Sequence, residues 1–255
     1  MLTPVLAYVM SCLGCFLGLR CTTRARAVQG PSRIRWLLLA AVSIGVAGIW
    51  GMHFIAMLGF SIPGQVIRYS VPVTILSMLI AVAVVSIGLL IVGLSGDGLR
   101  PLLTGGLVIG LGVASMHYIG MSAMRMPDTM QYDAALVVLS VIIAVVAGTV
   151  ALFAALRLDT VWSAFVACLI MGVAVSGMHY TGIAALHVHT SAAVMAEGGT
   201  SASSFLVPLI VGISLLTMLL TSAISLSPTE AELRKEDEFI ERIASHHDGH
   251  AGRDS

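Results

Sequence analysis

Seven long segments that carry no charged residue dominate this chain of 255 residues. A helix needs about 20 mostly apolar residues to cross the hydrocarbon core of a bilayer. Each segment is about that long and contains no Asp, Glu, Lys or Arg. The segments are Leu2 to Leu19, Trp36 to Leu58, Val71 to Leu94, Leu102 to Met124, Ala134 to Leu156, Thr160 to Leu186 and Phe205 to Leu226. We therefore predict an all-α polytopic membrane protein with seven transmembrane helices.

The charge content excludes several other classes of protein. Charged residues make up 10% of the chain, whereas soluble domains carry about 25%. The 13 basic and 13 acidic residues balance, and no basic block exists that could attract a phosphate backbone. We therefore expect a lipid bilayer as partner and no nucleic acid, and neither a soluble enzyme nor a disordered protein.

The placement of Lys and Arg predicts the orientation of the helices. Eleven basic residues fall on the side of the first loop and the tail, and two, Arg68 and Arg125, fall on the other. The eleven are Arg20, Arg24, Arg26, Arg33, Arg35, Arg100, Arg157, Arg234, Lys235, Arg242 and Arg253. Because basic residues accumulate in cytoplasmic loops, we predict that the N-terminus lies outside and the C-terminus in the cytoplasm of a plasma membrane.

The chain divides at the end of the seventh segment, into a membrane domain (residues 1–226) and a short cytoplasmic tail (residues 227–255). The first segment is not read as a cleaved signal, because its basic residues follow the apolar run instead of preceding it.

An internal repeat places one histidine in every second helix. Gly48 to Met57, Gly112 to Met121 and Ala174 to Ile183 align without gaps, and their histidines are His53, His117 and His179. Each spacing covers two helices, so the sequence predicts three parallel two-helix repeats. An α-helix rises about 1.5 Å per residue. Counted from the inner end of each segment, this rise places all three histidines in the outer third of the membrane at similar depth. They can therefore converge on one point.

Small residues surround each histidine, at two positions before it and three after it. They are Gly51, Ser115 and Gly177, and Ala56, Gly120 and Gly182. Small residues let membrane helices approach closely. Ionisable groups inside a membrane are costly and point to function, so we predict that the three imidazoles share a site.

Methionines favour a soft metal at that site. Nine of the 14 methionines lie in the outer part of the molecule. Imidazole with thioether suits copper, especially Cu(I), while zinc through three histidines and haem stay open as alternatives. Met57 and Met121 follow their histidines by four residues and share a helix face with them, whereas Met52, Met116 and Met178 point about 100° away.

Other residues have two interpretations each. Phe54, Tyr118 and Tyr180 follow the histidines and form an interfacial aromatic belt, or the two tyrosines hydrogen-bond a metal ligand. Cys12, Cys15 and Cys168 are packing residues or an inner thiol site. His187 and His189 are exposed loop residues or replace the thioether missing at Ile183. His246, His247 and His250 form a cluster in the tail.

The sequence resembles the bacterial MHYT domain family over residues 1 to 226. The third motif, Met178-His179-Tyr180-Thr181, is complete, and the others read Met116-His117-Tyr118-Ile119 and Met52-His53-Phe54-Ile55. The resemblance implies an integral sensor of the bacterial plasma membrane that binds copper near the outer face and, through it, O2, CO or NO. By motif, the implied ligands are Met52, His53, Met116, His117, Met178 and His179, to which helix spacing adds Met57 and Met121.

Many relatives carry an output domain after the last helix, whereas only a short tail follows here. We therefore expect a stand-alone member and a cytoplasmic signalling partner reached through the tail.

Three functions are compatible with such a site: a sensor, a copper-dependent redox enzyme and a copper carrier. An enzyme would be expected to have a titratable group for proton transfer beside the metal, and the spans offer only His, Tyr and Cys. A carrier would need ligands that continue inward, and these are few. The sequence therefore favours a sensor that is not an enzyme.

Overall fold

The computed structural model of the chain describes residues 2–61, 67–96, 98–125, 129–189 and 200–226. The tail with His246, His247 and His250 lies outside these residues. The elements are α1 (Leu2–Ala27), α2 (Gly30–Val42), the π-helix η1 (Ser43–Gly51), α3 (Met52–Met57), β1 (Arg68–Tyr69), α4 (Val71–Ser95), α5 (Leu99–Ser122), β2 (Met124–Arg125), β3 (Thr129–Tyr132), α6 (Ala134–Arg157), α7 (Val161–Ala184), β4 (Leu186–His189), β5 (Thr200–Ser201) and α8 (Ala202–Leu226).

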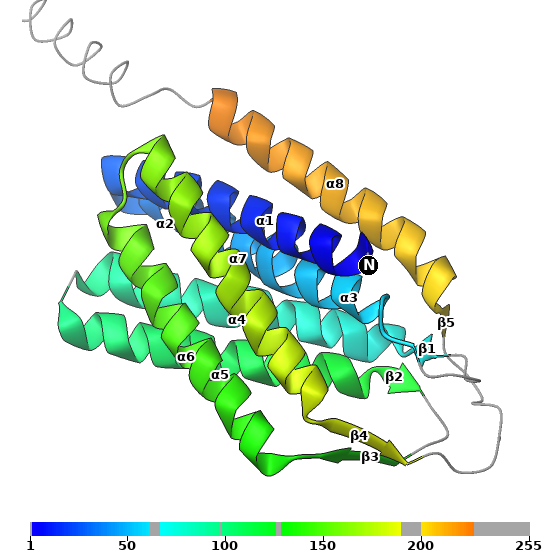
Figure 1. Cartoon of the computed structure of the whole chain (residues 1–255). Coiled ribbons are helices and arrows are strands. Elements are labelled where there is room, and N and C mark those ends of the chain that lie inside the picture. Colours follow the sequence, from blue (N-terminus) through cyan, green and yellow to red (C-terminus); the bar gives the residue numbers. More distant parts are fainter. Residues whose placement is uncertain (1, 62–66, 97, 126–128, 190–199, 227–255) are drawn as a thin grey trace, which may run out of the picture. The chain divides into compact units, whose positions relative to one another are not determined.

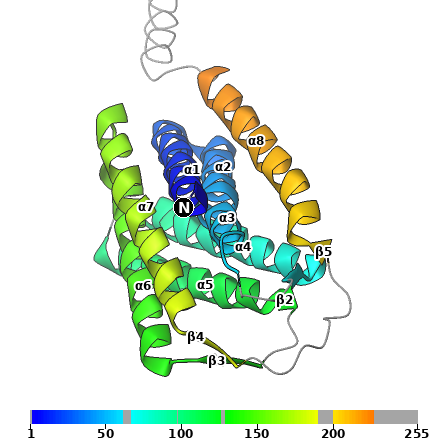
Figure 2. The same ribbon diagram turned by 45° about the vertical axis from the view of Figure 1, so that its right-hand side comes forward.

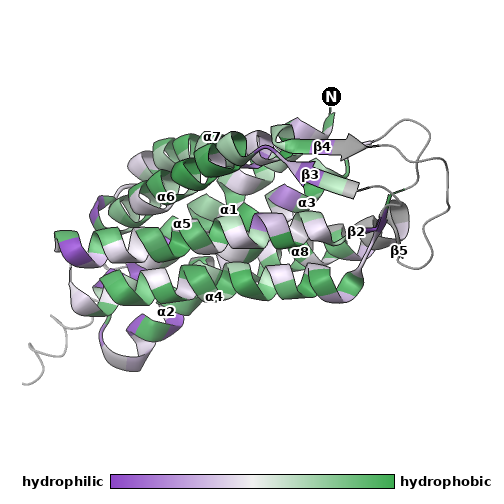
Figure 3. Ribbon diagram, turned by 90° about the horizontal axis from the view of Figure 1, so that it is seen from below, coloured by the Kyte–Doolittle hydropathy of each residue, from purple (hydrophilic) through white to green (hydrophobic). Residues whose placement is uncertain are grey.

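Long apolar helices dominate the described residues, as the charge-free segments predict. Six of them are long and apolar enough to cross a membrane: α1, the continuous run Gly30–Met57, α4, α5, α6 and α7. The seventh predicted segment forms α8, whose apolar stretch Val211–Ile224 is shorter. The fold is therefore all-α and polytopic. The helices are largely hydrophobic along their length (Figure 3), and in α6 the side chains of Val138, Ile142 and Val146 are more than half exposed.

Helices α1 to α7 pack in a ring within the unit that spans residues 1–220. The order around the ring is α1, α2 with η1, α4, α5, α6 and α7, and α7 packs against α1 again (Figure 2). The helices that carry the histidine motifs therefore alternate with α4, α6 and α1. The three motif helices run in the same direction and end near the short strands (Figure 1). This arrangement places their equivalent residues at the same level.

Close backbone contact explains why small residues are needed between the helices. A Cβ added to Gly14 of α1 would lie 2.2 Å from the backbone nitrogen of Gly48 in η1. In the same interface the Ser43 hydroxyl donates to the Gly14 carbonyl at 2.9 Å. The sequence did not predict the π-helix, which directly precedes the first Met-His pair. Such wide turns occur frequently at functional sites.

Short strands connect the helix ends at the level of the motifs. β1 pairs antiparallel with β2 and β5, and β3 pairs antiparallel with β4. Tyr69 of β1 is buried, and its hydroxyl donates to the Met57 carbonyl at 3.4 Å. Burial raises the pKa of Tyr69 to about 12, so this side chain stays neutral at physiological pH. The strand thus covers the end of the first motif helix.

Cysteine labelling tests the predicted orientation. Gln29 and Ser61 are exposed and lie at opposite ends of the run Gly30–Met57. In whole cells, a membrane-impermeant maleimide should label Ser61→Cys and should reach Gln29→Cys only after lysis. The unsubstituted protein, whose four cysteines lie within or next to α1 and α7, serves as the background. The reverse pattern would place the histidines near the cytoplasmic face.

Candidate metal centre

His53 of α3, His117 of α5 and His179 of α7 meet at one point inside the ring. All three side chains are buried, with at most 1% of their surface exposed. The Nδ1 atom of His53 lies 3.0 Å from Nδ1 of His179 and 3.1 Å from Nδ1 of His117. The ring centroids are 4.9 to 5.0 Å apart and the ring planes are nearly perpendicular to one another. The convergence expected from equal depth and parallel repeats is found. We call these three residues the histidine triad.

Hydrogen bonding alone cannot satisfy the triad. A ring nitrogen has one in-plane position, which holds either a proton or a lone pair. Nδ1 of His53 faces two other Nδ1 atoms at hydrogen-bonding distance, and it can bond only one of them. At least one of the three buried nitrogens is therefore left without a good partner in the protein. Buried polar groups in this situation are costly and call for an explanation.

The opposite nitrogens of the rings rest against the neighbouring motif helices. A Cβ added to Gly120 of α5 would lie 2.5 Å from Nε2 of His53, and one added to Gly182 of α7 would lie 2.3 Å from Nε2 of His117. The rings of His53 and His117 are thus each seated on the glycine that follows the next histidine by three residues. Ala56 holds the corresponding position in the first repeat. All three Nε2 atoms are buried and make no hydrogen bond to the described residues.

The arrangement fits a single metal ion. Metal–nitrogen bonds of about 2.0 to 2.1 Å place three nitrogens around one ion roughly 3.3 to 3.6 Å apart. The two separations from Nδ1 of His53, 3.0 Å to His179 and 3.1 Å to His117, differ from this by a few tenths of an ångström. Among the described residues, the triad is also the only group of three or more His, Cys, Asp or Glu whose ligand atoms all lie close together, within 4.8 Å. Its three lone pairs can therefore converge on a cation.

The predicted methionine ligands are buried beside or near the triad. At most 2% of the side chain of each is exposed: Met52, Met57, Met116, Met121 and Met178. Their burial keeps the surroundings of the histidines apolar and rich in sulfur. Their role as ligands stays a prediction.

The aromatic residue after each histidine packs edge-on against it, with ring centroids 4.9 to 5.1 Å apart. The Tyr118 hydroxyl bonds to Ser140 of α6 at 2.7 Å, so it anchors the triad helix to its neighbour and does not orient a histidine. His187 is exposed in β4, opposite Gln131 of β3, and lies outside the triad. The four cysteines are free thiols, and three of them are buried.

Comparisons with known proteins agree with this architecture. The sequence model of the MHYT family, described as a bacterial signalling protein N-terminal repeat, matches residues 47–105 and 110–168. Each matched stretch begins a few residues before one of the first two histidines. No solved structure matches the chain.

Three signalling proteins are similar over most of the chain. The bifunctional diguanylate cyclase/cyclic di-GMP phosphodiesterase MucR of Pseudomonas aeruginosa is 33% identical over 89% of this chain and 33% of its own length. The cyclic di-GMP phosphodiesterase NbdA of the same organism is 38% identical over 78% of this chain and 26% of its own length. Signaling protein YkoW of Bacillus subtilis is 29% identical over 72% of this chain and 24% of its own length.

The chain thus spans a third or less of the length of these relatives. The residues matched by the family model hold the first two histidine motifs. Two repeat matches in register with His53 and His117, together with these relatives, show that the chain belongs to the MHYT family.

Proposed function

We propose that this membrane protein is a sensor that binds copper through the histidine triad and, through copper, a diatomic gas such as O2, CO or NO. The observation that carries the proposal is that Nδ1 of His53 lies 3.0 and 3.1 Å from the Nδ1 atoms of His179 and His117, and the protein alone cannot satisfy all three nitrogens. Bound copper would supply an open coordination position for a small ligand. The chain supplies the three nitrogens, seats the rings on Gly120 and Gly182, and keeps water away by burial.

Copper is favoured over zinc and haem by the surroundings of the triad. Five buried methionines accompany the histidines; thioethers suit Cu(I), whereas the usual zinc ligands are Cys, His and carboxylates. A haem would need space for a macrocycle between or beside its axial nitrogens, whereas Nδ1 of His53 is in contact with both other Nδ1 atoms. One small ion therefore fits better than a haem.

A sensor is favoured over an enzyme or a carrier. The names of MucR and NbdA describe cyclic di-GMP enzymes, but the alignment covers a third or less of each protein. The helices themselves contain no carboxylate that could transfer protons beside the triad. We therefore propose that the triad reports ligand binding to a signalling partner and catalyses no reaction. Contact with that partner through residues 227–255 stays a prediction.

Infrared spectroscopy of the carbonyl complex tests this function. The purified protein is loaded with Cu(I) and exposed to CO. We expect one C–O stretching band that shifts with ¹³CO, because an ion held by three nitrogens keeps a free position. The His117→Ala protein, treated in the same way, is the control and should show no such band. A copper-loaded wild type without a CO or NO complex would contradict the gas-sensing proposal.

A further inference from the structure

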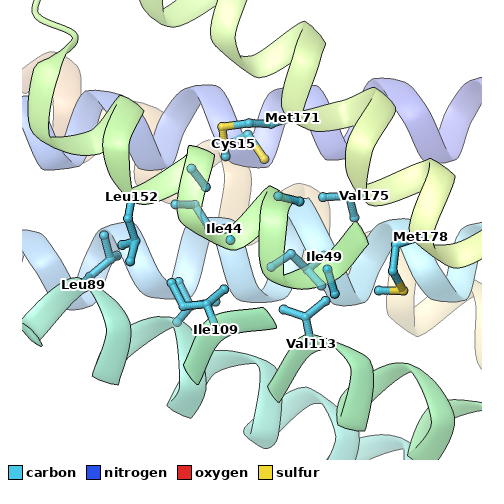
Figure 4. A pocket seen from close by; sticks show the side chains of 15 residues that line it. Cys15, Ile44, Ile49, Leu89, Ile109, Val113, Leu152, Met171, Val175 and Met178 are labelled. Atoms are coloured by element: carbon cyan, nitrogen blue, oxygen red, sulfur yellow. The ribbon is translucent and has the colours of Figure 1, made fainter. Parts of the chain in front are cut away.

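A cavity of about 40 Å³ lies on the inner side of the histidine triad. Ile49, Val113 and Val175 line it, and each precedes its triad histidine by four residues. Four residues are about one turn of an α-helix, so the cavity begins about one turn inward from the triad. Figure 4 shows these three side chains and Met178 at one end of the cavity, and Leu89 and Leu152 at the other.

The wall of the cavity is apolar. It consists of aliphatic side chains and small residues, and its polar or polarisable groups are the sulfur atoms of Cys15, Met171 and Met178. A buried water needs two to four polar partners, and cavities without them stay dry and bind apolar guests such as xenon. The volume corresponds to roughly three water-sized spheres by the same measure. This is enough for a molecule of two atoms.

Helix α6 separates the cavity from the bilayer with small residues. Ala144, Ala147, Gly148 and Ala151 line the cavity from this side, and Ala147 and Ala151 are themselves half-buried. On the same helix, Val146 and Val150 face outward, with 57% and 46% of their surface exposed. Ala147 and Ala151 therefore line the cavity and are also partly exposed on the surface of the helix ring.

We propose that this cavity is a second binding site, for an apolar diatomic gas, which collects the gas from the bilayer and delivers it to the triad from its inner side. The proposal rests on the proposed function for what happens at the triad. Binding in the cavity itself depends only on its size and its apolar wall. Entry of the gas from the bilayer is also compatible with a buried triad, because a gas that dissolves in lipid needs no opening to water.

Xenon binding tests the cavity without any metal. Metal-free wild-type protein should bind xenon at one saturable site, measured by ¹²⁹Xe NMR. Leucine at Ala147 or Ala151 fills the cavity and should abolish this binding. Leucine at the outward-facing Val146 or Val150 is the matched control and should leave it unchanged. Absence of a saturable xenon site in the wild type would overturn the proposal.

Rebinding of CO after photolysis tests the delivery route. In Cu(I)-loaded protein, Ala147→Leu and Ala151→Leu should slow CO association about tenfold or more, because they block the approach while the triad is intact. Copper content, measured in parallel, should equal that of the wild type. Association as fast as in the wild type would overturn the route, even with xenon bound. A wild type that binds xenon but no copper would contradict only the proposed function.

Discussion

Replacing His53 by alanine is expected to abolish tight copper binding. Its Nδ1 contacts both other Nδ1 atoms of the triad, so its loss leaves two nitrogens with no shared neighbour. Removing a residue that merely supports a metal ligand costs about 10- to 100-fold in affinity, so the loss of a ligand should cost at least about 100-fold. A competition titration against a Cu(I) chelator measures the change. His117→Ala and His179→Ala should behave similarly.

The methionine variants are the controls for this experiment. Met57→Ala and Met121→Ala each remove a buried thioether four residues after a histidine. We expect a loss of roughly tenfold or less from either, because other buried methionines lie nearby and can replace it. Affinity close to the wild type in His53→Ala, or a larger loss in Met57→Ala than in His53→Ala, would contradict the assignment of the histidines as the main ligands.

Alanine at Gly120 or Gly182 should also abolish copper binding, although neither residue can bind a metal. The added methyl carbon would lie 2.5 Å from Nε2 of His53 or 2.3 Å from Nε2 of His117. Both distances are well below van der Waals contact, so the imidazole must move. If a ring moves by about 1 Å, its Nδ1 atom can no longer bind the same ion as the other two, because metal–nitrogen distances vary by only about 0.2 Å from their usual values. The same titration measures the loss.

Gly177→Ala provides the matched control on α7. A Cβ at Gly177 meets nothing within 4 Å, so the same change of residue type leaves the triad undisturbed. Copper affinity of this variant should equal that of the wild type, and its thermal stability should be equal or slightly higher, because Ala favours a helix interior more than Gly does. Wild-type copper affinity in both Gly120→Ala and Gly182→Ala would show that the rings do not depend on these glycines for their position.

Much of the fold follows from the sequence because the bilayer restricts the choice. Charge-free segments of the right length must become helices, since every backbone polar group in the hydrocarbon core needs a partner. The approach of the histidines is equally predictable from three in-register motifs on parallel helices. Small residues at Gly120 and Gly182 predicted close packing, and the structure adds that they seat the neighbouring rings.

Other features depend on packing that no local pattern encodes. The π-helix Ser43–Gly51 forms where Gly14 of α1 meets the backbone of Gly48, a contact between distant parts of the chain. The pairing of Arg68 with Arg125 and Ser201 joins three loops that are far apart in sequence. The cavity inward from the triad results from side chains of six helical segments. Contacts of this kind determine local geometry that cannot be predicted from hydropathy or from sequence motifs.

Copper analysis of the wild type and of the triple variant His53→Ala, His117→Ala, His179→Ala tests the central claim most directly. Both proteins are purified after growth with copper, and metal per chain is measured by mass spectrometry. A thermal unfolding scan confirms that both are folded. We expect one copper per wild-type chain and none in the triple variant. Equal copper content in the two proteins would contradict the account and leave the triad as a structural histidine core.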